Sequence, residues 1–202
     1  MSKTVYIVGA GGHARVVLEA LLQAGREVGG IIDRDESLWG REFCGVRVLG
    51  NDDVLREMGP ENIELANGVG AAARYNDAGL EARARVFDAF RKDGFRFATV
   101  YGKNCTIASD AVIGQGSQIM AGSVIQPGVV IGENVIVNTG AAVDHDCRIA
   151  SHVHIAPGAC LCGNVVVDEL SFIGAGAVII QGNHIGRQAL VAAGAVVSRP
   201  VD

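Results

Sequence analysis

Two short motifs in the C-terminal half of the chain carry side chains that could do acid–base chemistry. The first places His145 between two carboxylates, Asp144 and Asp146. A neighbouring carboxylate raises the basicity of an imidazole and fixes its tautomer, which suits a general base. The second motif, His152-Val-His154, offers two imidazoles, but no third ligand nearby completes a metal site. We therefore expect His145 to act as a base, and we expect no metal.

A third motif, near the start of the chain, could hold a phosphate-bearing ligand. The segment Gly9-Ala-Gly11-Gly12-His13-Ala14 matches G-x-G-x-x-G/A, and Asp33 ends the next apolar run. In dinucleotide-binding folds such glycines let backbone approach a phosphate at a helix N-terminus, and the acid binds a ribose. We therefore expect nucleotide binding. A full NAD site is disfavoured, because the segment has only about three strands where the dinucleotide fold has six.

The elements that position these motifs follow from a six-residue repeat. From Ile107 to Val197, every sixth residue is aliphatic. Most residues four positions further on are small, as at Ala111, Ser117 and Ala141. Such a period is typical of a parallel β-helix, in which aliphatic side chains point inward and small ones fill the corners. Three hexads make a triangular coil of about 18 residues, and coils stack about 4.8 Å apart.

The repeat also predicts where each candidate side chain lies. The triplet Asp144–Asp146 falls between two inward positions and should point outward. Gly163 stands one coil further along than His145, so its backbone N–H should lie near the base, as an oxyanion requires. His154 is half a coil away from His145. A site that uses both histidines should therefore span two subunits.

The first hundred residues alternate between strand and helix patterns. Apolar runs predict strands at Val5–Val8, Val28–Ile32 and Ile63–Ala66, and helical spacing covers 14–24, 52–58 and 76–92. This order predicts an α/β, Rossmann-like βαβαβ unit with a parallel sheet over residues 1–100. The all-β parallel β-helix should then occupy residues 101–202.

Composition excludes several classes of protein. The net charge is −5 without a basic run, which argues against nucleic-acid binding. No apolar run is long enough to span a membrane. The five cysteines are odd in number and lack CxxC spacing, which argues against a disulfide framework or structural zinc. We expect reduced thiols and a cytoplasmic location.

The chain resembles the NeuD/PglD group of bacterial sugar acetyltransferases, within the left-handed β-helix superfamily of hexapeptide-repeat proteins. The likeness covers nearly the whole chain and is carried by VGAGGHARVV, IVNTGAAVDHDC and SHVHIAPGACLCGNV. It implies a left-handed β-helix, a homotrimer and acetyl-CoA in the cleft between neighbouring β-helices. It also implies direct transfer of an acetyl group from acetyl-CoA to the amine of a nucleotide-linked 4-amino-4,6-dideoxy sugar, in surface-glycan or glycoprotein sugar biosynthesis.

The resemblance assigns roles to individual residues. His145 matches the family's catalytic base and Asp146 the carboxylate that orients it. His154 and the backbone of Gly163 match groups that contact the acetyl-CoA thioester. The residues that match the nucleotide-sugar site are Gly11, Gly12, His13, Asp33 and, near the sugar, Asn138.

Two features depart from the family's pattern. Gly70-Ala71-Ala72 stands where close relatives often have Gly-Asn-Asn, so we expect the nucleotide pocket to differ in its preference. The sequence ends at Asp202, where family members usually continue into a G-x-P-A-[KR] segment that touches the CoA tail. We therefore expect either that the chain is truncated or that it binds CoA through different contacts.

Three other functions stay open at this point. One is O-acetylation of sialic acid or a related sugar. Another is a small NAD-dependent oxidoreductase that uses the glycine motif. The third is a β-helix that serves only for assembly, against which the Asp-His-Asp triplet argues.

Overall fold

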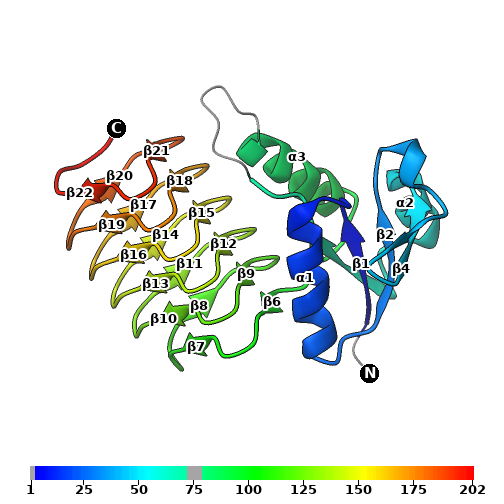
Figure 1. Ribbon diagram of the computed structural model, residues 1–202, viewed down its shortest axis with the longest axis horizontal. Coiled ribbons are helices and arrows are strands. Elements are labelled where there is room, and N and C mark those ends of the chain that lie inside the picture. Colours follow the sequence, from blue (N-terminus) through cyan, green and yellow to red (C-terminus); the bar gives the residue numbers. More distant parts are fainter. Residues whose placement is uncertain (1–2, 72–78) are drawn as a thin grey trace.

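The structure, a computed structural model, describes residues 3–71 and 79–202. A small α/β part and a long β-helix meet near Val100 (Figure 1). The elements of the α/β part are β1 (Thr4–Val8), α1 (Gly12–Gln23), β2 (Val28–Ile32), the 3-10 helix η1 (Glu36–Leu38), β3 (Glu42–Phe43), β4 (Val46–Gly50), α2 (Asp52–Met58), β5 (Ile63–Asn67) and α3 (Gly79–Lys92).

The α/β part is built on a five-stranded sheet in the order β3-β4-β2-β1-β5. Strands β1, β2, β4 and β5 pair in parallel, as the alternation of strands and helices predicts. Val5 and Ile7 of β1 are fully buried against Val17 and Leu21 of α1. The carboxyl ends of the parallel strands therefore meet at one edge, where the glycine turn and Asp33 lie.

The sequence missed two strands of this sheet. β3 and β4 form an antiparallel hairpin around Cys44 and Gly45, whose φ values are +51° and +81°. Both positive values belong to a type I′ turn, which prefers Asn-Gly or Asp-Gly. Cys-Gly gives a weaker signal, so the prediction of about three strands was incomplete.

The predicted helices agree with the structure in position. Helix α1 begins two residues before its predicted start and ends next to Gly25, whose φ of +67° lets the chain reverse. Helix α3 is described from Gly79, so the predicted start at Asn76 lies outside the described residues. Across residues 3–71 and 79–202, no helix combines the length and hydropathy that a bilayer crossing needs.

The predicted parallel β-helix is confirmed. Its two-residue strands are β6 (Val100–Tyr101), β7 (Thr106–Ile107), β8 (Val112–Ile113), β9 (Gln118–Ile119), β10 (Val124–Ile125), β11 (Val130–Ile131), β12 (Ile136–Val137), β13 (Ala142–Val143), β14 (Arg148–Ile149), β15 (His154–Ile155), β16 (Cys160–Leu161), β17 (Val166–Val167), β18 (Phe172–Ile173), β19 (Val178–Ile179), β20 (His184–Ile185), β21 (Leu190–Val191) and β22 (Val196–Val197).

The strands form three parallel sheets, which are the faces of a triangular prism (Figure 1). The β6 sheet holds β6, β9, β12, β15, β18 and β21; the β7 sheet holds β7, β10, β13, β16, β19 and β22; the β8 sheet holds β8, β11, β14, β17 and β20. Each strand pairs with the one a coil further on, as Val143 does with Leu161. The register matches the coil length that the repeat predicted.

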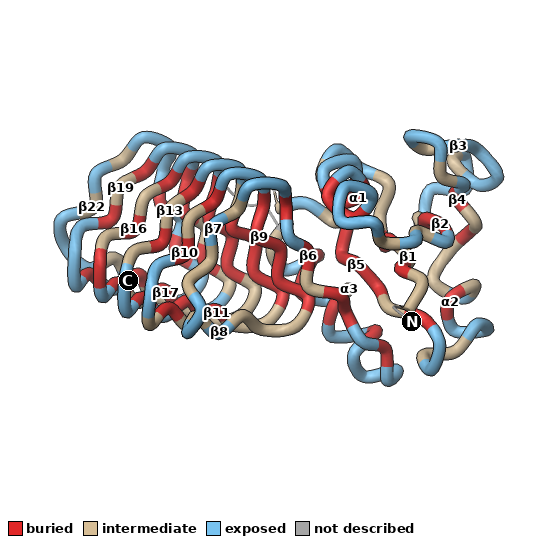
Figure 2. The backbone as a smooth tube through the Cα atoms, turned by 90° about the horizontal axis from the view of Figure 1, so that it is seen from below, coloured by how far each residue is buried: buried red, intermediate tan, exposed pale blue. Residues whose placement is uncertain are grey.

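The interior of the prism holds the aliphatic ladder. Ile125, Val143, Leu161 and Ile179 are buried along the β7 sheet, and the small residues at the corners, such as Ala141, are buried beside them. Figure 2 shows the buried positions recurring from coil to coil, with exposed turns between them. Burial of one large side chain per strand is the main source of stability for strands this short.

Leu161→Ala should lower the free energy of unfolding by about 2–5 kcal/mol, because it leaves a cavity in a close-packed interior. Val112→Ala is the matched control, since Val112 is 57% exposed on the β8 sheet, and it should change stability by less than about 0.5 kcal/mol. Chemical denaturation followed by circular dichroism measures both. Equal losses for the two variants would contradict the inward assignment.

Candidate active site

His145 lies at an outward corner of the prism, in the turn between β13 and β14. Its Nδ1 is 2.9 Å from Oδ2 of Asp146, and both side chains are more than half exposed. A carboxylate can only accept, so Nδ1 carries the proton and Nε2 keeps the lone pair of a base. The triplet Asp144–Asp146 thus faces outward, as the repeat predicted.

The backbone holds Asp146 in this orientation. Its φ is +61°, a left-handed conformation that Asp and Asn tolerate better than most residues do. Its N–H donates to the Pro127 carbonyl over 3.0 Å. The hydrogen bond to Asp146, with a further contribution from the charge of Asp144, raises the pKa of His145 above its ordinary value of 6.5.

Gly163 occupies the equivalent position one coil further along. The neighbouring Asn164 N–H donates to the carbonyl of His145 over 2.8 Å, which ties the two coils together. A Cβ on Gly163 would overlap the imidazole ring of His145, so glycine at this position lets the ring keep its place. Among the described residues, the Gly163 N–H has no hydrogen-bond acceptor. The residue that stacks against the imidazole therefore has a free backbone N–H, a group that could stabilise an oxyanion.

His154 lies on the β6 sheet and is almost fully buried. Its Nε2 is 3.3 Å from Nδ2 of Asn138. Oδ1 of Asn138 accepts the Thr139 N–H over 2.8 Å, so the amide NH₂ faces His154. Nε2 of His154 is then an acceptor, and Nδ1 carries the proton. That N–H is buried, and no residue in the described ranges accepts it.

His13 lies in the first turn of α1, and its side chain contacts the β-helix. Its Nε2 is 2.6 Å from Oε1 of Gln118, whose Nε2 donates to the Asn67 carbonyl over 2.8 Å. Gln118 therefore presents its oxygen, and Nε2 of His13 carries the proton.

Burial, with the charge of Arg83, lowers the pKa of His13 to about 4. Burial also lowers the pKa of His154 to about 3, and the charges of His13 and Arg83 add to that effect. Two neutral histidines from different parts of the chain thus lie near each other.

Arg83 and Asn67 hold the junction between the two parts. Arg83 is fully buried, and its Nη1 donates to the carbonyls of Asn67 and Val69 over 2.9 and 2.8 Å. The side chain of Asn67 donates to Asn134 of the β-helix over 3.1 Å. Burial lowers the pKa of Arg83 to about 9, so it stays charged at neutral pH. The turn after β5 is therefore fixed against the face that carries His154.

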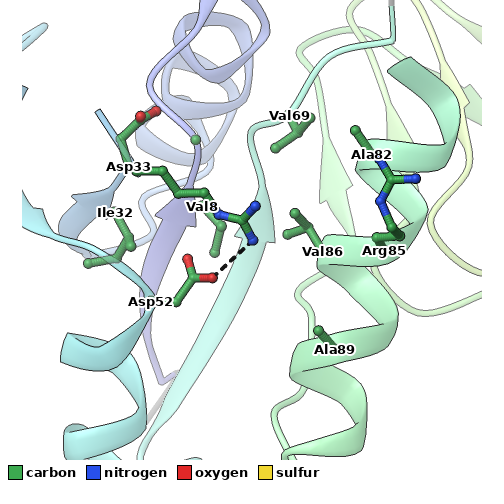
Figure 3. A pocket seen from close by; sticks show the side chains of 11 residues that line it. Val8, Ile32, Asp33, Asp52, Val69, Ala82, Arg85, Val86 and Ala89 are labelled. Atoms are coloured by element: carbon green, nitrogen blue, oxygen red, sulfur yellow. Dashed lines mark hydrogen bonds and ion pairs between the residues drawn. The ribbon is translucent and has the colours of Figure 1, made fainter. Parts of the chain in front are cut away.

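A cavity of about 590 Å³ opens at the carboxyl ends of β1 and β2. Figure 3 labels Val8, Ile32, Asp33 and Asp52 on one side and Ala82, Arg85, Val86 and Ala89 of α3 on the other, with Val69 between them. Gly9 and Arg34 complete the lining. Its size suits a small-molecule ligand.

Asp33 lines this cavity, but it also braces the glycine turn. Its Oδ2 accepts the Ala10 N–H over 2.6 Å, and its Oδ1 accepts the Asp35 N–H over 2.8 Å. Gly11 caps α1 and Gly12 begins it, both exposed. They lie beside the cavity and do not line it.

A second cavity, of about 550 Å³, lies over the β6 sheet. Asn138, His154, Phe172 and Leu190 line it together with Ala71, and small corner residues complete its floor. The rings of His154 and Phe172 are 4.7 Å apart. Gly70-Ala71-Ala72 is the segment that differs from the Gly-Asn-Asn of close relatives. Ala71 lies at this cavity, and Ala72 lies outside the described residues.

The predicted site residues form three groups within one chain. The first is His145, Asp146 and Gly163, at the corner between the β7 and β8 sheets. The second is His13, Asn138 and His154, on the β6 sheet. The third is Gly11, Gly12 and Asp33, at the glycine turn. Sequence reasoning missed Gln118 and Arg83, although a polar residue among outward apolar positions and an arginine on the buried side of a helix could have signalled them.

No metal site emerges from the histidines. His152 contacts Asn134 over 3.0 Å and packs against Phe87, away from the partners of His154. Across residues 3–71 and 79–202, no group of three or more His, Cys, Asp or Glu side chains could hold a metal ion.

Comparison with known proteins gives consistent matches along the whole chain. The PglD N-terminal domain family matches residues 4–74, and the bacterial transferase hexapeptide family matches residues 110–145. A GDP-perosamine N-acetyltransferase from Escherichia coli O157:H7 is 30% identical over 183 residues, which cover 87% of this chain and 77% of the relative. The chain belongs to the PglD-type family of hexapeptide-repeat sugar acetyltransferases.

Two solved structures of this family are similar over the full chain. The acetyltransferase domain of PglB from Neisseria gonorrhoeae FA1090, in complex with acetyl coenzyme A, has a TM-score of 0.89 at 34% identity and covers 100% of this chain and 93% of its own. PerB from Caulobacter crescentus, in complex with CoA and GDP-perosamine, has a TM-score of 0.87 at 35% identity and covers 100% and 91%. The fold is therefore the α/β unit and left-handed β-helix that the resemblance implied.

The histidine titrations should separate cleanly by NMR. His145 should titrate above pH 6.5, because Asp146 stabilises its protonated form, whereas His13 and His154 should stay neutral down to about pH 4 and 3. Asp146→Asn should move the His145 midpoint to lower pH and leave the other two unchanged. An unchanged His145 midpoint in that variant would contradict the assigned hydrogen bond.

Proposed function

We propose that this protein transfers an acetyl group from acetyl-CoA to the amine of a nucleotide-linked 4-amino-4,6-dideoxy sugar. The observation that carries the proposal is the His145–Asp146 pair beside the free N–H of Gly163, in a member of the sugar acetyltransferase family. The curated relative is named for N-acetylation of a nucleotide-linked amino sugar, and solved relatives hold acetyl-CoA, CoA and GDP-perosamine.

In this proposal the sugar amine attacks the thioester directly, with His145 as the base. The sugar nitrogen attacks the thioester carbonyl carbon, and Nε2 of His145 takes the proton that the nitrogen loses. The carbonyl oxygen becomes negative and accepts the Gly163 N–H. His154, which lines the cavity proposed for acetyl-CoA, contacts the thioester. The C–S bond then breaks, the thiolate of CoA takes up the proton from Nε2 of His145, and the acetylated amide is released. Asp146 holds the imidazole in the right tautomer throughout.

Each part of the chain holds one substrate in this proposal. Residues 1–100 hold the nucleotide sugar, with Gly11, Gly12, His13 and Asp33 at or beside the glycine turn. Asn138 of the β-helix lies near the sugar end of the site. Residues 101–202 hold acetyl-CoA in the cavity over the β6 sheet, whose small corner residues suit a thin, extended arm. This two-substrate arrangement supplies proximity, which contributes more to the rate than the base alone does.

A homotrimer would complete the site. The outward positions of the β7 sheet form an apolar ladder of Val124, Ala142, Cys160, Val178 and Val196, the last 71% exposed. An apolar face of this kind suits an interface between copies. His145 lies at one border of this sheet and the cavity that contains His154 lies at the other, so rotation about a three-fold axis brings His145 of one subunit to the cavity of the next. A cytoplasmic location fits the five free cysteines.

A panel of UDP-, GDP- and dTDP-linked amino sugars and free sialic acid, mixed with acetyl-CoA, tests the reaction through release of free thiol. We expect transfer to at least one nucleotide-linked amino sugar. His145→Ala should lower kcat about 10²–10⁴-fold with the fold retained. Transfer to sialic acid but to no nucleotide sugar would favour the O-acetyltransferase alternative and overturn the proposal.

Mixed assemblies test the shared site. Subunits with His145→Ala and subunits with His154→Ala should each be nearly inactive alone. Unfolded together and refolded, they should recover about a quarter of the wild-type rate, because random assembly pairs an intact His145 with an intact neighbouring His154 in that share of interfaces. Mixtures that stay inactive, although size-exclusion chromatography shows mixed trimers, would place both histidines in separate roles.

A further inference from the structure

The cavity at the carboxyl ends of β1 and β2 contains a charged pair that the glycine turn does not explain. Oδ2 of Asp52 is 3.3 Å from Nη2 of Arg34, and both residues line the cavity (Figure 3). Asp52 begins α2, directly after its cap Asn51. Its side chain is 19% exposed and that of Arg34 is 77% exposed. The carboxylate is therefore the fixed partner, and the guanidinium is the one that can move.

The walls around this pair are apolar and shaped by small residues. Ala82, Val86 and Ala89 lie on one face of α3, since they are four and three positions apart. Val8 and Ile32 lie on the opposite side of the cavity (Figure 3). An apolar slot between two such walls suits the flat faces of a nucleobase, and the charged pair would meet its polar edge.

From this arrangement we infer that Asp52, together with Arg34, selects guanine as the base of the nucleotide sugar. The inference rests on the proposed function for the identity of the ligand as a nucleotide sugar. In this arrangement, the two carboxylate oxygens of Asp52 accept hydrogen bonds from the N1–H and the N2–H of guanine. Arg34 donates a hydrogen bond to O6 of the same base.

The hydrogen-bonding edges of the bases support this choice. A fixed carboxylate offers two adjacent acceptors, and among the common bases only guanine presents two adjacent N–H donors on its pairing edge. Uracil and thymine present one N–H between two carbonyl oxygens, so a carboxylate there faces an acceptor. Cytosine and adenine present a single amino group beside a ring acceptor. Each of these bases would leave a buried acceptor unpaired, which is costly.

Other groups at the cavity do not compete for this role. Asp33 has both oxygens engaged by backbone N–H groups of the glycine turn and the following loop. Arg85 lies on the α3 side, where its Nη1 is 3.4 Å from Glu81, and it offers donors only. Within the described ranges, Oδ1 of Asp52 accepts no hydrogen bond, and its Oδ2 is engaged only by Arg34. The carboxylate therefore has free accepting capacity that faces the cavity.

Calorimetric titration of the full chain with GDP, UDP, CDP and ADP tests the inference without any catalytic step. We expect GDP to bind at least about tenfold more tightly than the other three, which corresponds to about 1.4 kcal/mol. Equal or tighter binding of UDP, CDP or ADP would overturn it.

Asp52→Asn provides the sharper test. The carboxamide keeps one acceptor and gains one donor, which matches uracil better than guanine. GDP affinity should fall about tenfold or more, and UDP affinity should stay equal or rise. Asp53→Asn is the matched control, because Asp53 lies in the same first turn of α2, is 69% exposed and does not line the cavity. Its GDP-to-UDP ratio should match that of the wild type.

Three results separate this inference from the proposed function. If Asp52→Asn weakens all nucleotides equally while circular dichroism shows an intact fold, Asp52 only shapes the cavity and the inference fails. If the chain acetylates a UDP-linked amino sugar and shows no preference for GDP, the proposed function stands and the inference fails. If GDP binds selectively but no nucleotide sugar is acetylated, the inference about the base stands and the proposed function fails.

Discussion

The hydrogen bonds between successive coils are the constraint on which the β-helix depends. Each two-residue strand is too short to be stable alone, so it is held by pairing with the strands one coil before and after it. The pairing of Val143 with Leu161 and of Ile149 with Val167 fixes a strict register. Because of that register, Gly163 lies over His145, and a backbone donor and a base from distant positions in the sequence meet without any specialised loop.

A second constraint acts where the α/β part meets the prism. Asn67, Gln118 and Arg83 form a buried network in which the amide groups of Asn67 and Gln118 and Nη1 of Arg83 donate to backbone carbonyls. The charge of Arg83 disfavours a second positive charge nearby, which helps keep His13 and His154 neutral. A neutral imidazole offers one donor and one acceptor in a defined arrangement, whereas an imidazolium offers only donors. The junction therefore sets the chemical character of the histidines that it covers.

The β-helix could be predicted from the sequence because every sixth position must hold an aliphatic side chain that points inward. This requirement repeats many times along the chain. Position 145 could be placed outward, and 163 above it, by counting alone. The β3–β4 hairpin could not, because its turn at Cys44-Gly45 lacks the usual residues. Gln118, the partner of His13, and Arg83, whose charge acts on His13 and His154, were also beyond reach, because they are distant in the sequence and meet only when the two parts pack. The role of Asp52 needs the cavity, which no local pattern encodes.

The strict stacking at Gly163 also limits how the length of this chain can change. A β-helix can gain or lose a whole coil and keep every inward side chain inward, so its natural unit of insertion or deletion is three hexads. Between His145 and Gly163 an inserted coil would place another residue over the imidazole, and unless that residue were also glycine, its side chain would displace the ring. The length of the coil that joins these two residues is thus limited by the chemistry of His145 as well as by packing.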